Sequence, residues 1–329
     1  MAQVIRGLLF LVIGLFVAGA ALWIVGPYEP VDRTIDFDPS TVPDDVDGWL
    51  ADREGRVSDL RPDAAKYIDW AGVPGTRTDI AIVYVHGFSA TLWEIRPVPE
   101  RVGEALGANV YFTRLTGHGR TGDAMAEATA GDWIEDLAEA VAVGRKLGNR
   151  VVIMGTSTGA TLAALLAADP ALADLKRDVA GMILISPNFR VANPAARLLS
   201  MPAARYWAGL VAGERRSFQP VNQRHGENWQ TEYPTVALLP MQAMIDHSAT
   251  LDWADADIPA LFWFSPDDSV VDHSATEAVA AAWGGPVTVE RIAVPEGDDP
   301  YDHVIAGDIL SPNGTPAAIA AMTDWIRGL

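Results

Sequence analysis

One stretch of the sequence decides the fold: Val151-Val152-Ile153-Met154-Gly155-Thr156-Ser157-Thr158-Gly159-Ala160-Thr161-Leu162. Four apolar residues run into Gly155-x-Ser157-x-Gly159, and an alanine-rich, helix-forming segment follows. The pattern predicts a buried strand, a tight turn with a serine at its tip, and a helix. Residues two before and two after this serine must be small, because larger side chains would collide with the strand and the helix. The turn is typical of a catalytic serine, although an ordinary glycine- and serine-rich turn would also fit this stretch alone.

On both sides of this stretch, apolar strands alternate with helical segments in steps of about 30 residues. We expect buried strands at 80–85, 109–113, 179–185, 258–264 and 287–294. Such alternation predicts a mostly parallel central sheet with helices on both faces. From 187 to about 256 the pattern is interrupted by prolines and bulky apolar residues, with no clear strand. We interpret this part as a helical cap insertion over the sheet.

The N-terminal segment Gly7–Val25 is almost wholly apolar and long enough to cross a bilayer as one helix. Arg6 precedes it, and the acidic residues Glu29 and Asp32 follow it. The positive-inside rule then places the N-terminus in the cytoplasm. We expect a single-pass membrane protein whose main domain lies on the non-cytoplasmic side, periplasmic or extracellular. A cleaved signal peptide, with a small-residue site at Ala18-Gly19-Ala20, is the alternative.

These patterns predict three parts of the chain. Residues 1–26 form a transmembrane anchor or signal segment, and residues 27–65 form a linker with a short amphipathic helix. Residues 66–329 form the main domain, which contains the cap insertion at about 187–256.

Composition excludes several kinds of site and partner. The 329-residue chain is 49% hydrophobic, which is enough for a sizeable core, and it has no cysteine. A disulfide framework, a thiolate nucleophile and a cysteine-bound zinc are therefore excluded. The formal net charge of -19 would repel phosphate backbones, so we expect no nucleic-acid partner.

Three further motifs stand where strands of the predicted sheet end. His86-Gly87-Phe88 follows the strand at 80–85, and Gly117-His118-Gly119 follows the strand at 109–113. An aspartate pair follows the strand at 258–264, and Asp302-His303 follows the last strand. Together with Gly155-x-Ser157-x-Gly159, the set resembles the α/β-hydrolase family over about residues 66–329. It is similar to the esterase, carboxylesterase and monoglyceride-lipase branch, so we expect the α/β-hydrolase fold.

The resemblance implies a catalytic triad in the chain order nucleophile, acid, histidine. Ser157 would be the nucleophile and His303, after the last strand, the base. His273 is the alternative base. The register Asp268-Ser269-Val270-Val271 fits the acid of the family best, with Asp267 as the alternative.

The resemblance also implies an oxyanion hole made by the backbone N–H groups of Phe88 and Thr158. The ring of Phe88 would either line an acyl pocket or pack in the core. Because serine and not aspartate stands at the turn, the family's haloalkane dehalogenases and epoxide hydrolases do not fit. No metal or organic cofactor is implied, since metal-binding and dinucleotide motifs are absent from the sequence.

The sequence thus predicts a membrane-anchored serine hydrolase that cleaves carboxylic esters through an acyl-enzyme. The apolar anchor and the aromatic cap favour a small ester substrate with an apolar acyl chain: a short-chain ester, a monoacylglycerol or a lysophospholipid. Thioester hydrolysis and acyl transfer by the same chemistry are alternatives. A non-catalytic binding protein of the hydrolase fold is a further alternative.

Overall fold

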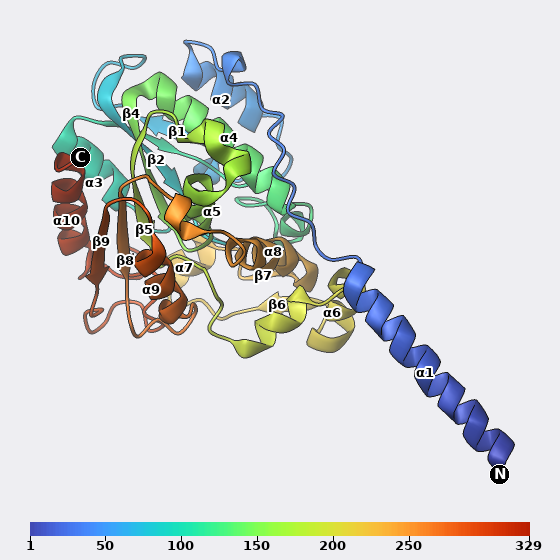
Figure 1. Cartoon of the computed structure of the whole chain (residues 1–329). Coiled ribbons are helices and arrows are strands. Elements are labelled where there is room, and N and C mark those ends of the chain that lie inside the picture. Colours follow the sequence, from blue (N-terminus) through green and yellow to red (C-terminus); the bar gives the residue numbers. More distant parts are fainter.

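The computed structural model describes residues 1–329, except for the side chain of Ala2. Its centre is a seven-stranded sheet in the order β1-β3-β2-β4-β5-β8-β9 (Figure 1). Only β1 is antiparallel to its neighbour, so the expected mostly parallel sheet is confirmed. The strands are β1 Tyr67–Asp69, β2 Thr78–Val85, β3 Asn109–Phe112, β4 Gly148–Thr156, β5 Val179–Ile185, β8 Ala260–Phe264 and β9 Val287–Arg291.

Helices cover both faces of the sheet, because the central strands are apolar on both sides. Along β2, Val83 and Val85 belong to one core, whereas Ile82 and Tyr84 belong to the other. Helices α4, α5 and α9 pack in the first core, and α3 and α10 pack in the second. These helices are α3 Val98–Leu106, α4 Ala130–Leu147, α5 Thr158–Ala168, α9 His273–Ala282 and α10 Thr315–Arg327.

The register of the parallel strands brings the ends of β2 and β4 together. Val85 pairs with Gly155, and Gly155 pairs with Leu184 of β5. The loops that follow these strands therefore leave the sheet side by side at its carboxyl edge. In open sheets of this kind, ligands bind at that edge.

A cap lies between β5 and β8 and contains the expected helices. It also contains a two-stranded antiparallel sheet, in which Arg216 pairs with Tyr233, where we expected no clear strand. Each strand has three residues, too few for a recognisable alternation of apolar and polar side chains. The elements of the cap are η5 Pro194–Ser200, α6 Ala204–Ala212, β6 Arg215–Ser217, α7 Gln223–Asn228, β7 Glu232–Pro234, η6 Thr235–Ala237, α8 Leu238–Ser248 and η7 Trp253–Asp255.

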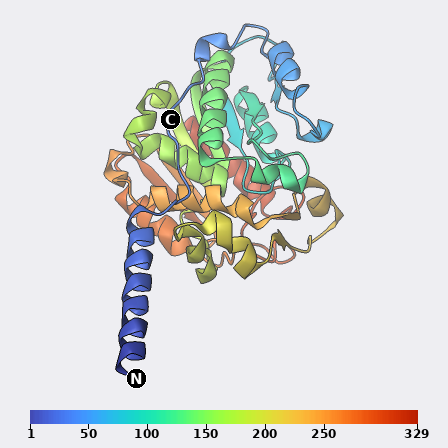
Figure 2. The same ribbon diagram turned by 90° about the vertical axis from the view of Figure 1, so that its right-hand side faces the viewer.

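The N-terminal helix α1, Ala2–Val25, projects from the domain (Figures 1 and 2). Its segment Gln3–Val25 has a mean hydropathy of 2.8 and is not buried by the rest of the chain. Length and composition suit a membrane anchor and a signal sequence alike. The remaining elements are α2 Val46–Glu54, η1 Pro39–Thr41, η2 Pro62–Ala64, η3 Gly122–Ala126 and η4 Pro170–Lys176.

Candidate active site

Ser157 stands in the sharp turn between β4 and α5. Its backbone has φ 52° and ψ -115°, a conformation that L-residues adopt only under strain. A β-carbon on Gly155 would stand 2.6 Å from the carbonyl oxygen of Gly159. A β-carbon on Gly159 would collide with the carbonyl oxygen of Val85 and lie 2.7 Å from that of His86. Both glycines are therefore required by close backbone approach, as the sequence predicted.

His303 and Asp268 are buried and are joined by a hydrogen bond between their side chains. The Nδ1 atom of His303 lies 2.8 Å from Oδ2 of Asp268. The other oxygen of Asp268 accepts the N–H groups of Val270 and Val271, at 2.8 and 2.9 Å. The carboxylate is thus fixed by three hydrogen bonds and holds the ring so that Nδ1 carries the proton.

The alternative residues lie elsewhere. Asp267, the alternative acid, is exposed to solvent. His273 begins α9 and is not among the residues that line the cavity with Ser157. Of the nearby aspartates considered from the sequence, only Asp268 contacts His303.

The loop that carries His303 is held by a residue that sequence reasoning missed. Asp299 is buried, and its Oδ2 atom accepts the N–H groups of His303 and Val304, at 3.1 and 2.8 Å. The hydroxyl of Ser186, directly after β5, donates to the carbonyl oxygen of His303 at 2.7 Å. An aspartate four residues before the histidine was the available signal, but its contacts depend on how the loop folds.

The charge state of His303 is set by its surroundings. Burial alone would lower its pKa, but the charge and hydrogen bond of Asp268, followed by the charge of Glu94, outweigh it and raise the pKa. Among the described residues, no hydrogen bond joins Ser157 to His303, although both line the same cavity. Such bonds are often long before substrate binds and tighten in the reacting complex.

Two backbone N–H groups beside Ser157 have no acceptor within the described part of the chain: those of Phe88 and Thr158. The N–H groups that flank Phe88 are engaged, since Gly87 donates to Glu94 and Ser89 donates to His118. The N–H of Thr158 is free because it begins α5, where no carbonyl oxygen precedes it in the helix. The N–H groups of Phe88 and Thr158 are therefore available to a ligand, and their role as an oxyanion hole stays a prediction.

Glu94 is a second residue that the sequence did not single out. It is buried and lines the cavity, and its Oε2 atom accepts the N–H of Gly87 at 2.7 Å and the hydroxyl of Tyr84 at 2.9 Å. A β-carbon on Gly87 would stand 2.6 Å from Oε1 of Glu94 and 3.1 Å from the β-carbon of Ser157. Burial raises the pKa of Glu94 to about 7, against the effect of its two donors and of His303.

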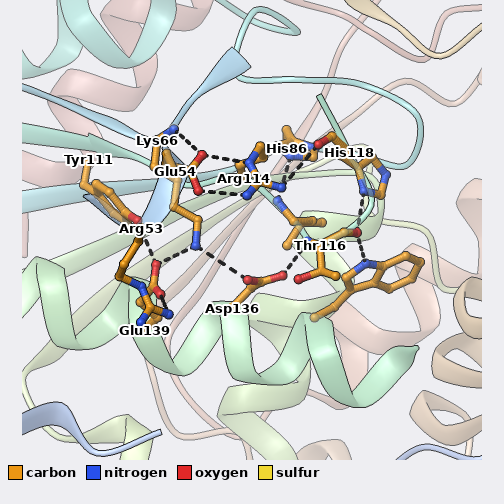
Figure 3. Close-up of polar contacts among 12 residues, drawn as sticks. Arg53, Glu54, Lys66, His86, Tyr111, Arg114, Thr116, His118, Asp136 and Glu139 are labelled. Atoms are coloured by element: carbon orange, nitrogen blue, oxygen red, sulfur yellow. Dashed lines mark hydrogen bonds and ion pairs between the residues drawn. The ribbon is translucent and has the colours of Figure 1, made fainter. Parts of the chain in front are cut away.

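His86 and His118 hold the loops behind the site together (Figure 3). The Nε2 atom of His86 accepts the N–H of Leu115 at 3.1 Å, and that of His118 accepts the N–H of Ser89 at 3.0 Å. Burial lowers the pKa of His86 well below its ordinary value and that of His118 to about 4. Both rings are therefore neutral and serve as acceptors for the loops, and neither lines the cavity.

A cavity of about 420 Å³ opens above Ser157. Its wall is mainly apolar, and the cap supplies much of it. The ring of Phe88 lines it as well, so this side chain belongs to the cavity. The cap residues at the cavity are Asn188, Val191, Phe218, His225, Trp229, Tyr233, Leu238 and Met241. Asn188 is buried, and its Oδ1 atom has no hydrogen-bond partner, which leaves one acceptor in an apolar surrounding.

Among the described residues, no group of three or more His, Asp or Glu side chains is arranged to hold a metal ion.

The sequence model of the Alpha/beta hydrolase family matches residues 82–321, nearly three quarters of the chain. The chain belongs to the alpha/beta hydrolase family. The matched part of this alpha/beta hydrolase contains Ser157, Asp268 and His303, whereas α1 and α2 lie outside it. No curated protein matches the chain by sequence.

Solved structures resemble this hydrolase over most of its length. A structure reported for the metagenome-derived lipolytic enzymes LipS and LipT has a TM-score of 0.63 at 20% identity, covering 82% of this chain and 100% of its own. The monoacylglycerol lipase of Paleococcus ferrophilus has a TM-score of 0.56 at 12% identity, covering 80% and 98%. A soluble variant of the Saccharomyces cerevisiae monoglyceride lipase has a TM-score of 0.56 at 12% identity, covering 80% and 91%. These likenesses show the fold.

Proposed function

We propose that this alpha/beta hydrolase is a serine hydrolase that cleaves carboxylic esters through an acyl-enzyme. One observation carries the proposal: His303, hydrogen-bonded to the buried Asp268, lines an apolar cavity together with a strained serine, and two backbone N–H groups beside that serine have no acceptor. The lipases and esterases among the similar structures support ester hydrolysis as the reaction. The roles of Ser157, His303 and Asp268 are assigned from the steps that ester hydrolysis requires.

In the first half-reaction, Oγ of Ser157 attacks the ester carbonyl carbon while Nε2 of His303 takes the hydroxyl proton. The carbonyl π electrons move to the oxygen, and the N–H groups of Phe88 and Thr158 stabilise the resulting oxyanion. The tetrahedral species then collapses. The bond to the alkoxy group breaks, and His303 gives its proton to the leaving alcohol. Asp268 keeps the imidazole oriented and stabilises its charged form.

In the second half-reaction, water attacks the acyl carbon and His303 accepts a proton from it. Collapse of the second tetrahedral species breaks the bond to Oγ, and His303 returns the proton to Ser157. The products are a carboxylic acid and the free enzyme, so no redox partner or cofactor enters the balance.

The cavity supports a substrate with an apolar acyl chain. Its volume of about 420 Å³ lies within the range typical of small-molecule sites, and its wall is mainly aromatic and aliphatic. We therefore propose short-chain esters, monoacylglycerols or lysophospholipids as the substrate class. The carboxyl of Glu94 and the free amide oxygen of Asn188 would meet the polar end of such a molecule.

The test is covalent labelling of the full chain in detergent with a fluorophosphonate probe. The parent protein and His273→Ala should be labelled, whereas Ser157→Ala and His303→Ala should not. The His273→Ala protein is the matched control, because His273 is the other histidine considered as base. Labelling that survives Ser157→Ala, or that is lost in His273→Ala but retained in His303→Ala, would contradict the assignment. A series of p-nitrophenyl esters of increasing acyl length then measures the chain preference.

A further inference from the structure

The cap segment 197–216 differs in charge from the rest of the protein. The chain has 24 basic and 43 acidic residues, but this segment has four arginines and a single acidic residue, Glu214. Two of the arginines, Arg197 and Arg216, form no salt bridge within the described residues; the other two, Arg205 and Arg215, do. Because Glu29, Asp123 and Glu232 pair with Arg205 and Arg215, the positive charge that the segment leaves unpaired is that of Arg197 and Arg216.

The same segment exposes large apolar side chains. On α6, Tyr206, Leu210 and Val211 are 75%, 83% and 68% exposed, and Leu198 and Met201 just before it are also exposed. Clustered apolar side chains of this size on a soluble surface mark an interaction site. We call residues 197–216 the basic apolar face.

This face adjoins the end of the apolar helix α1. The carbonyl oxygen of Pro27 accepts the N–H of Ala203 at 2.8 Å, and Glu29 forms an ion pair with Arg205. The position of a β-carbon on Gly26 would lie 2.7 Å from the β-carbon of Pro202, so the two segments are in close contact. In Figure 2, where α1 points downward, the yellow-green cap segments form the lower edge of the domain. Helix α6 therefore begins next to the C-terminal end of α1.

We propose that the basic apolar face binds the surface of an anionic phospholipid bilayer in which α1 is inserted. Two properties of the face together indicate a lipid bilayer as the surface that it binds. The exposed tyrosine, leucine and valine suit the boundary between head groups and acyl chains, and the unpaired arginines suit phosphate groups. Charges more than about 8 Å away are largely screened at physiological salt. The acidic residues that contact the face, Glu29, Asp123 and Glu232, are paired with Arg205 and Arg215, so the attraction comes from Arg197 and Arg216.

The proposal concerns how the domain sits on the bilayer and is independent of ester hydrolysis. It rests on α1 being present and inserted, which the test provides by using the full chain reconstituted in vesicles. Binding is read without substrate, so a failure here and a failure of the proposed reaction are distinguishable.

The absence of cysteine from the chain allows single, defined fluorescent labels. The test compares Val211→Cys with Val73→Cys, since both valines are exposed, 68% and 74%, and only Val211 lies on the face. Each variant carries an environment-sensitive nitrobenzoxadiazole label in vesicles containing 30% phosphatidylglycerol. We expect the label at 211 to shift to shorter wavelength and to be quenched by doxyl lipids, and the label at 73 to do neither. Equal behaviour of the two labels would overturn the proposal.

A second comparison tests the anionic preference. Phosphatidylcholine vesicles should give a smaller shift at position 211 than vesicles with phosphatidylglycerol. The change Arg197→Gln with Arg216→Gln should abolish the difference between the two lipids. The control Arg56→Gln with Arg327→Gln removes the same charge from exposed positions outside the face and should preserve it. An equal shift in both lipids with the parent face, or an equal loss in both double variants, would overturn the assignment to anionic lipid.

Discussion

At the residue scale, Asp268 and Asp267 are neighbours in the chain, but their carboxyl groups lie in different surroundings. Asp268 is buried against His303, whereas Asp267 is exposed. We predict that Asp268→Asn lowers kcat for a p-nitrophenyl ester by about four orders of magnitude, because the amide favours the wrong imidazole tautomer. Asp267→Asn is the matched control and should stay within about twofold of the parent. Similar losses in both variants would show that neither contact is specific.

Glu94 gives a prediction about pH. Burial raises the pKa of Glu94 to about 7, the charge of Asp268 raises the pKa of His303, and the charges of Glu94 and His303 affect each other. Ionised Glu94 favours protonated His303, which cannot accept the proton of Ser157. Glu94→Gln removes this charge, so the acid limb of the kcat/KM profile should move to lower pH. The exposed Glu290→Gln provides the control and should leave the limb in place.

The direction in which the acid limb moves follows from the effect of Glu94 on the pKa of His303. The rate rises as His303 loses its proton, so a lower pKa of His303 extends activity toward acid. The variant lacks the ionisation of Glu94, so its acid limb should report His303 without the influence of that charge. An unchanged midpoint in Glu94→Gln would mean that the two groups do not interact.

At the element scale, α2 is tied to the loop behind the site by buried charges (Figure 3). Glu54 binds Arg114 through two hydrogen bonds of 2.8 Å, and Arg114 donates to the carbonyl oxygen of His118. On the same side, Lys66 lies between Glu139 and Asp136. Helix α2 lies outside the region that the family model matches.

We predict that Glu54→Gln lowers the free energy of unfolding by roughly 3–5 kcal/mol, because it leaves the Arg114 charge buried and unpaired. Asp52→Asn on the same helix breaks an exposed pair with Arg56 and should cost less than about 1 kcal/mol. Urea unfolding of the full chain in detergent measures both. Equal costs would show that the buried position of Glu54 does not matter.

The Glu54 pair also predicts acid sensitivity. Burial would raise the pKa of Glu54, but the hydrogen bond and charge of Arg114 outweigh it and lower the pKa below 4.5. The stabilisation is therefore present above pH 4.5 and is lost as the pH falls through the lower, folded-state pKa. Glu54→Gln should flatten this part of the dependence of stability on pH.

The elements differ in how well they could be predicted. The strands around Ser157 are buried apolar runs, and their alternation with helices was enough to predict the sheet and the place of its loops. The short strands β6 and β7 lack such a pattern, so the cap was predicted as helical only. Asp299 and Glu94 act through contacts between loops that are distant in the chain or that turn sharply. Asp299 lies only four residues before His303, but its contacts depend on how that loop folds, and no local spacing marks Glu94.

At the scale of the whole molecule, the chain has at one end an apolar helix long enough to span a membrane, and a large domain after it. If residues 1–26 are retained as an anchor, as we propose, the domain lies on the non-cytoplasmic side. We predict that a membrane-impermeant maleimide labels Val73→Cys on intact cells without permeabilisation. A cysteine introduced at Gln3, before the apolar run, should react only after permeabilisation. The reverse pattern would invert the topology.

The mass of the purified full-length chain tests the signal-peptide alternative. An anchor leaves residues 1–26 in the protein, whereas cleavage after Ala20 would remove α1 up to that residue. We predict that the protein isolated from the membrane fraction has the mass of the uncleaved chain. A mature chain that begins at Ala21 and fractionates as soluble protein would contradict retention of the anchor.

The segment between α1 and α2 is bound to the domain along its way. Arg33 forms an ion pair with the buried Asp169, which also contacts His247 of the cap, and the N–H of Phe37 donates to Glu135. These contacts hold the segment after α1 against the domain. The domain is therefore expected to stay close to the membrane end of α1. Substrate encounter would then be a search in two dimensions. The rate should follow the mole fraction of substrate in the bilayer rather than its bulk concentration.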